Sequence, residues 1–218
     1  GNFFTFTIGK DNRKYMFLRT RDTEIRNAIT VSSWQNEQEA KATTSSIRNK
    51  WMNLKLVITP TSMAIYKDGV LIAENKNVTI TISDLGVDLI AYLGKSFYPE
   101  DAYFRGYFDN VKVYNRALSA LEIAGEFGIK IPAVKGVSAE GYHVITSQID
   151  TENNKIKVYF SRNNSERKDL TQVPLTYDLV EGCTLEGENG APVDLTSPVT
   201  VKVNVPGQNQ QVWTVEGV

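Results

Sequence analysis

The sequence predicts an all-β protein made of two sandwich domains. Apolar residues recur at every second position in most segments, and short turn signals separate these segments from one another. A single segment has helical spacing instead. The chain has 218 residues, of which 41% are hydrophobic and 22% charged, and this is enough for one or two domains with a core each. Short alternating strands at this spacing are typical of β-sandwiches.

The predicted strands of the first domain alternate apolar and polar residues, so each has a buried face and a wetter one. They cover residues 4–8, 15–18, 28–31, 51–58, 64–66, 78–82, 89–93 and 108–114. The polar stretch from Trp34 to Ser46 predicts a loop or a weak edge strand. Asp68-Gly69 between two apolar runs predicts a type I′ hairpin, because both central residues of that turn need a positive φ.

One short helix is predicted near residue 120. Ser119 is followed three residues later by Glu122, which is the capping-box pattern of a helix start. Leu121 and Phe127 contribute to an apolar face, and Gly128 can end the helix. We expect this helix to pack on the edge of the first domain's sheet.

A change in charge indicates a domain boundary. Residues 1–132 carry 17 basic and 14 acidic side chains, whereas residues 133–218 carry 7 and 11. Pro132 and Gly136 interrupt the pattern where the sign changes, so the predicted domains are 1–132 and 133–218. The second domain has predicted strands at 142–149, 155–160, 173–179, 199–205 and 211–215, which favour a small immunoglobulin-like sandwich. With Cys183 as the single cysteine, this sandwich has no internal disulfide.

A family resemblance enters with three motifs. They are the strand that begins at Trp51, the Tyr66-x-Asp68-Gly69 hairpin, and the run from Gly106 to Ser119 that contains Tyr-Asn-Arg-Ala-Leu-Ser. Together they resemble the laminin-G-like, or concanavalin A-like, jelly-roll domain appended to many secreted bacterial glycan-degrading enzymes. The resemblance covers residues 4–127, and residues 133–218 resemble the small Ig-like modules found beside such domains.

The resemblance implies a non-catalytic accessory or carbohydrate-binding module of an exported bacterial protein. Its place would be extracellular, on the outer-membrane surface or in the periplasm. Family members usually carry one or two strands ahead of the segment that matches residues 4–18. We therefore expect an open sheet edge that can pair with another chain. Two alternatives stay open: the accessory part of a glycoside hydrolase whose catalytic domain lies elsewhere, and a structural or protein-binding surface module.

No catalytic residues are predicted. Glycoside cleavage usually needs two carboxyl groups across the scissile bond. Jelly-roll glucanases carry theirs as Glu-x-Asp-x-x-Glu on one strand, and this spacing does not occur in the sequence. His143 has no neighbouring triad signature, and Cys183 lacks the flanking pattern of a nucleophile. The chain is therefore predicted not to be an enzyme.

Four residues are candidates for carbohydrate binding. Sugars stack their apolar C–H faces on aromatic rings and pair their hydroxyls with polar side chains. Trp34 lies in a polar loop, and Tyr98, Asp101 and Tyr103 share a second one, so these four are the predicted ligand-binding residues. The other two tryptophans, Trp51 and Trp213, lie in strand patterns, and we expect both in the core.

Calcium is the one predicted cofactor, and the resemblance implies it. Laminin-G-like domains often bind one Ca²⁺ in a rim loop through hard oxygen ligands. The candidate ligands here are Asp101, Asp109 and Asn110. A net charge of −1 gives no reason to expect nucleic acid as a partner. The sequence also contains no apolar run of about 18 residues, so no transmembrane segment is predicted.

Overall fold

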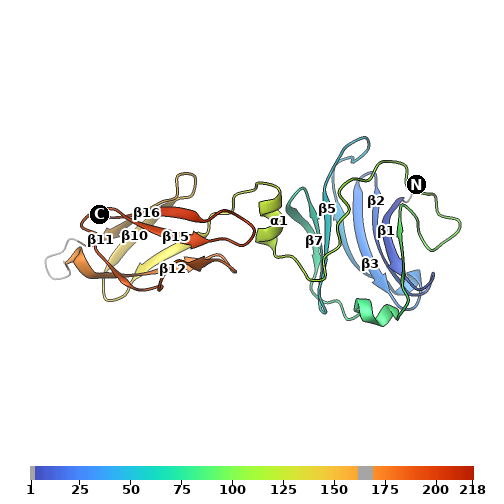
Figure 1. Ribbon diagram of the computed structural model, residues 1–218, viewed down its shortest axis with the longest axis horizontal. Coiled ribbons are helices and arrows are strands. Elements are labelled where there is room, and N and C mark those ends of the chain that lie inside the picture. The colour runs from blue at the N-terminus through green and yellow to red at the C-terminus, as the bar shows by residue number, and fades with distance from the viewer. Residues whose placement is uncertain (1–2, 162–168) are drawn as a thin grey trace. The chain divides into compact units, whose positions relative to one another are not determined.

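The computed structural model describes residues 3–161 and 169–218 (Figure 1). The chain divides into two compact units, Gly1–Ala120 and Leu121–Val218. Almost all regular structure is strand, which confirms the predicted all-β class. The division falls before the predicted boundary at residue 132, because the helix that follows Ala120 packs into the core of the second unit.

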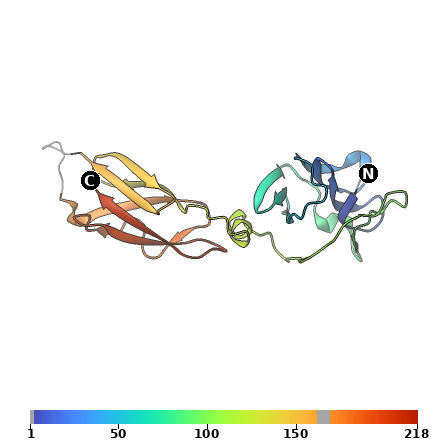
Figure 2. The same ribbon diagram turned by 90° about the horizontal axis from the view of Figure 1, so that it is seen from above.

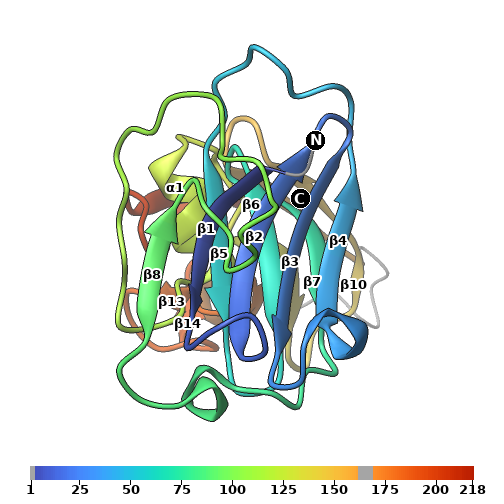
Figure 3. The same cartoon turned by 90° about the vertical axis from the view of Figure 1, so that its right-hand side faces the viewer.

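The first unit has two antiparallel sheets (Figure 3). The larger has the order β4-β3-β2-β1-β8, with β1 at Phe3–Gly9, β2 at Tyr15–Arg21, β3 at Glu24–Thr30, β4 at Gln38–Thr43 and β8 at Ile90–Leu93. The smaller is β5-β6-β7, with β5 at Leu54–Ile58, β6 at Met63–Lys67 and β7 at Val70–Asn75. Asp68 and Gly69 join β6 to β7 with φ values of 50° and 81°, as the hairpin prediction requires. Two 3₁₀ turns, η1 at Trp34–Asn36 and η2 at Ile82–Leu85, complete the regular structure of this unit.

The larger sheet of the first unit is apolar on both faces. Met16 and Leu18 of β2 point into a core that also contains Met63 and Ile65 of the smaller sheet. Because successive strand residues point to opposite faces, the residue between the first two, Phe17, lies on the other side. There it belongs to a separate aromatic cluster. The larger sheet thus packs apolar side chains on both of its faces.

Two of the predicted strands do not form. Residues 78–82 alternate as a strand would, but the backbone N–H groups of Thr79 and Ile80 donate to the Gln38 side chain, and Thr81 with Asp84 forms the capping box of η2. Residues 108–114 contain no strand either. A strand needs a neighbour for its backbone groups, and none of the strands in the described part of the chain pairs with this segment.

The second unit also contains two sheets (Figures 1 and 2). The larger has the order β10-β11-β16-β15-β13, with β10 at Val144–Asp150, β11 at Lys155–Phe160, β16 at Gln211–Gly217, β15 at Val199–Asn204 and β13 at Thr184–Leu185. The smaller is β14-β12-β9, with β14 at Pro192–Val193, β12 at Val173–Leu179 and β9 at Val134–Ala139, and a 3₁₀ turn, η3 at Leu170–Gln172, precedes β12. One core joins the sheets, and Trp213 is fully buried in it, as predicted. The Ig-like assignment of this unit stays a prediction.

The predicted helix forms as α1, Ala120–Glu126, but it packs elsewhere than expected. Leu121 belongs to the buried core of the second unit, so the expectation that the helix covers the first sheet is wrong. Gly128 follows the helix with φ 67°. No helix in the described residues has the length and apolar character needed to cross a membrane.

The packing of α1 depends on Gly207. This residue has φ 70°, and a Cβ there would lie 2.6 Å from Glu122 Cα on the helix. We expect Gly207→Ala to destabilise the second unit by more than the roughly 1–2 kcal/mol that a left-handed conformation alone costs. Urea unfolding followed by the fluorescence of buried Trp213 measures the change. Gly128→Ala is the matched control, since its φ is also positive but nothing lies within 4 Å of its Cβ. Equal losses for the two variants would contradict the role of the contact.

Candidate functional site

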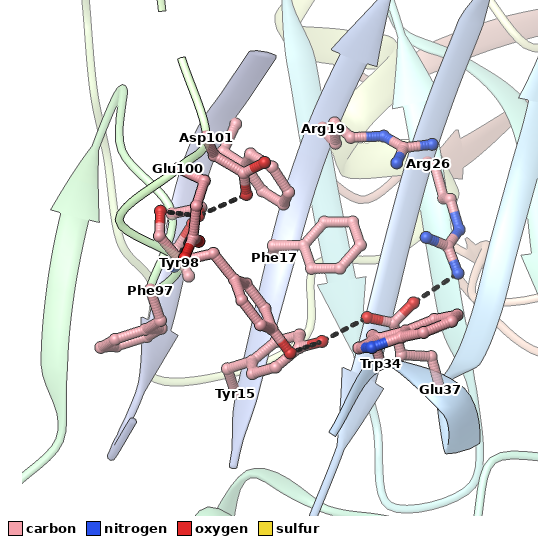
Figure 4. Close-up of a pocket in the computed structure, with 13 residues that line it drawn as sticks. Tyr15, Phe17, Arg19, Arg26, Trp34, Glu37, Phe97, Tyr98, Glu100 and Asp101 are labelled. Atoms are coloured by element: carbon pink, nitrogen blue, oxygen red, sulfur yellow. Dashed lines mark hydrogen bonds and ion pairs between the residues drawn. The ribbon is translucent and has the colours of Figure 1, made fainter. Parts of the chain in front are cut away.

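A cavity of about 330 Å³ lies on the face of the larger sheet of the first unit that is turned away from the core (Figure 4). We refer to it as the aromatic cavity. Its lining comes from β1, β2, β3, the segment around η1 and the loop after β8: Phe4, Thr7, Tyr15, Phe17, Arg19, Arg26, Trp34, Glu37, Ser96, Phe97, Tyr98, Glu100 and Asp101.

The floor of the aromatic cavity is a cluster of rings. Strand alternation puts Tyr15 and Phe17 on the same face of β2, with ring centroids 6.0 Å apart in a stacked arrangement. Phe4 of β1 packs edge-on against Phe17 at 5.0 Å. Arg26 of β3 lies over the Phe17 ring at 5.3 Å. These contacts hold a rigid apolar surface at the base of the cavity.

A buried carboxylate, Glu37, organises one side. Only 6% of its side chain is exposed. One oxygen accepts a hydrogen bond from Arg26 Nη2 at 2.6 Å, and the other accepts from the Tyr15 hydroxyl at 2.5 Å. Burial, and then the hydrogen bond to Glu37, raise the pKa of Tyr15 above its ordinary value. The phenol therefore stays a neutral donor that fixes the position of the carboxylate.

The opposite side is the loop that follows β8. The Ser96 hydroxyl donates to Asp101 Oδ2 at 2.6 Å and accepts from the Tyr98 backbone N–H at 2.8 Å. The Tyr98 hydroxyl donates to the Asn12 carbonyl at 2.9 Å and approaches the Tyr15 hydroxyl at 3.5 Å. These bonds tie the loop to the sheet, so the Asp101 carboxylate has a defined position at the rim of the cavity.

Two arginines stand side by side at the third side of the cavity. Arg19 and Arg26 are directly opposite each other in the register of β2 and β3, where like charges repel. Each is neutralised by carboxylates: Arg19 pairs with Glu24, and Arg26 pairs with both Glu37 and Glu39. Burial alone would raise the pKa of Glu39, but its hydrogen bond to Arg26 holds that pKa below the ordinary value.

Three of the four predicted ligand-binding residues line the aromatic cavity. Trp34 and Tyr98 lie on different sides of it, with Asp101 near Tyr98 (Figure 4), and 62% of Trp34 is exposed. Tyr103 is exposed and is not part of the lining. Sugar binding by any of these residues stays a prediction.

The sequence analysis missed the floor and the charged side of the cavity. Tyr15 and Phe17 fall in a predicted strand and Glu37 in the predicted polar loop, whereas Arg26 lies outside every predicted element. One signal was available: Tyr15-Met16-Phe17-Leu18 is apolar at every position, which indicates a strand covered on both faces.

The expectation that Trp51 lies in the core is wrong, because 71% of this side chain is exposed.

The candidate calcium ligands have hydrogen-bond partners within the protein. Asp101 accepts from Ser96, and Asp109 Oδ1 accepts from the neighbouring Asn110 backbone N–H at 2.8 Å. Within the described ranges, no group of three or more His, Cys, Asp or Glu side chains is placed to hold a metal ion. The donor set thus does not fit a calcium site built from carboxylates, and calcium binding stays a prediction from the resemblance alone.

Comparison with known proteins identifies the first unit. The model of the laminin-G family described as the concanavalin A-like lectin/glucanases superfamily matches residues 1–124. An α-L-arabinofuranosidase of Bifidobacterium longum is 37% identical over 129 residues, which cover 54% of this chain and 12% of that protein. The chain thus matches only a small part of that relative.

Two solved structures match parts of the chain, both with low TM-scores. An S-layer domain-containing protein of Clostridium thermocellum is 26% identical, with a TM-score of 0.34, over 56% of this chain and 61% of that one. A putative glycoside hydrolase of Bacteroides thetaiotaomicron is 23% identical, with a TM-score of 0.34, over 39% of this chain and 24% of that one. The family model covers more than half of the chain, so this protein belongs to the concanavalin A-like lectin/glucanase superfamily.

Proposed function

We propose that the first unit is a non-catalytic carbohydrate-binding module and that the aromatic cavity is its sugar site. The observation that carries the proposal is the combination of a ring-lined floor with fixed polar groups on its sides. Trp34 is 62% exposed and offers apolar surface, whereas Phe17 is almost wholly buried in the floor, and Glu37 and Asp101 are held in place by hydrogen bonds. This combination is what sugar sites need, because a pyranose or furanose presents both C–H faces and hydroxyls.

The relatives support a role in glycan use. The Bifidobacterium longum relative is an α-L-arabinofuranosidase, and this chain matches a region that is a small part of it. We infer that the module serves as an accessory domain that brings such an enzyme, or a surface protein, to an arabinose-containing polysaccharide. The corresponding location is outside the bacterial cytoplasm, at the cell surface or in the periplasm.

Replacing Trp34 tests the proposal. We expect Trp34→Ala to weaken binding to arabinan or arabinogalactan by about tenfold or more, as the loss of an exposed aromatic anchor commonly does. Isothermal titration calorimetry and affinity electrophoresis in polysaccharide gels measure the change. Trp51→Ala is the matched control, because it removes a similarly exposed tryptophan that does not line the cavity. Equal losses in both variants would place the site elsewhere.

A second candidate is a protein-binding module. The segment 102–119 follows the loop of the cavity, and several of its apolar side chains are exposed, among them Tyr107, Val111 and Val113. Strand β8 lies at the end of the larger sheet, and an edge strand of this kind is where another chain could pair. Absence of binding to every polysaccharide tested would favour this alternative.

A further inference from the structure

We infer that the aromatic cavity selects uncharged sugar residues and rejects uronic acids. This inference rests on the proposed function and adds the substrate class to it. It follows from the charges of the lining and from how they are paired.

The cations that line the cavity are already paired with carboxylates. Among the described lining residues the cationic side chains are Arg19 and Arg26. Arg26 uses Nε for Glu39 and Nη2 for Glu37. Arg19 donates through Nη2 to Glu24, and its Nε is buried away from solvent, where a ligand in the cavity cannot reach it. A carboxylate on a sugar would therefore meet arginines whose charge carboxylates of the protein already balance.

The lining also carries excess negative charge. Glu37, Glu100 and Asp101 outnumber the two arginines, and Glu24 and Glu39 form ion pairs with these arginines. Two unit charges at about 4 Å interact by about 1 kcal/mol even in bulk water, and more strongly beside a protein wall. A uronate in the cavity would therefore be repelled. A neutral sugar would instead donate its hydroxyls to carboxylate oxygens, which are strong acceptors.

Matched polysaccharides test the inference. The probe is an arabinogalactan that contains glucuronic acid, titrated before and after chemical reduction of its carboxyl groups to alcohols. We expect the reduced polymer to bind roughly fivefold more tightly at low salt. The difference should shrink at higher salt, because ions screen the exposed part of the repulsion. Equal or tighter binding of the acidic polymer would overturn the inference, whereas absence of binding to both polymers would instead contradict the proposed function.

A charge variant supplies the second readout. Glu100 is exposed at the rim, so Glu100→Gln removes one negative charge without disturbing a buried contact. We expect it to reduce the preference for the neutral polymer, mainly by improving binding of the acidic one. Glu140→Gln, an exposed carboxylate of the second unit, is the matched control and should leave the preference unchanged. A preference that Glu100→Gln leaves unchanged would contradict the electrostatic explanation.

Discussion

Replacing Trp213 by alanine is expected to destabilise the second unit by about 3–5 kcal/mol, the range for removing a large buried aromatic side chain. Trp213 is fully buried at the centre of β16 and pairs across the sheet with Val201. A domain of this size has roughly 5–15 kcal/mol of stability in total. The substitution should therefore remove a large part of it and leave a substantial unfolded fraction at moderate urea concentrations.

The tryptophan also contributes to a polar network. Its indole Nε1 donates to Gln211 Oε1 at 3.3 Å, and the same oxygen accepts from the Ala133 backbone N–H at 3.0 Å. Gln211 Nε2 in turn donates to the Ile131 carbonyl at 2.6 Å. The Gln211 side chain thus connects Trp213 in the core to the segment that leads from α1 into β9.

Hydrogen exchange measured peptide by peptide can assign the loss to one unit. In Trp213→Ala, protection should fall in peptides from β11, β15 and β16, while β2 and β3 of the first unit keep theirs. Trp213→Phe should cost less, because its ring refills part of the space. Trp51→Ala should stay within about 0.5 kcal/mol, since that side chain is exposed. Unchanged protection in the β16 peptides of Trp213→Ala would show that Trp213 does not support the core.

Most strands of the first unit could be predicted from the sequence because alternation and turn chemistry are local. Phe4, Phe6 and Ile8 locate β1, although a bulge between Phe4 and Phe6 turns Phe4 to the opposite face of the sheet. Asp68-Gly69 forces one turn conformation. The predicted strand at residues 78–82 does not form for a local reason that the alternating pattern does not reveal. Thr81 and Asp84 form their own capping box, and this competes with strand pairing.

The failure at residues 108–114 has a non-local cause. Phe108, Val111 and Val113 have the spacing of a strand, but the side chains are exposed and the described chain supplies no neighbouring strand. An alternating pattern indicates that a segment is suited to a sheet, but it does not indicate whether a neighbouring strand is available to pair with it. The prediction that Trp51 lies in the core is wrong for a related reason, since its ring lies 6.4 Å from the exposed Tyr107 of this same region.

The candidate site could be predicted only in part. Trp34, Tyr98 and Asp101 stood out because aromatic rings in polar loops can stack on sugars and a carboxylate beside them can pair with hydroxyls. Glu37 did not stand out, because its importance comes from burial between Arg26 and Tyr15. That burial depends on the register that aligns β2, β3 and β4, and the register is a property of the whole sheet.

Removing Arg26 should strongly destabilise the charged side of the cavity. Breaking a buried ion pair by deleting one partner typically costs 3–5 kcal/mol, because the other charge stays buried without compensation. In Arg26→Met the methylene chain is largely kept, but Glu37 loses its cation while only 6% of its side chain reaches solvent. We expect a loss of about 3 kcal/mol, at the low end of that range, because 18% of the Arg26 side chain is exposed and partly screened.

A double-mutant cycle separates this cost from lost packing. Glu37→Gln removes the stranded charge and keeps an oxygen that can accept from Tyr15, so adding it to Arg26→Met should restore part of the stability in urea unfolding. Arg48→Met is the control. Arg48 pairs with Asp22 at the surface with 74% of its side chain exposed, and such pairs contribute between about zero and 1 kcal/mol. If Arg26→Met were as mild as Arg48→Met, or if Glu37→Gln added a further loss, the buried pair would not be what holds the charged side of the cavity together.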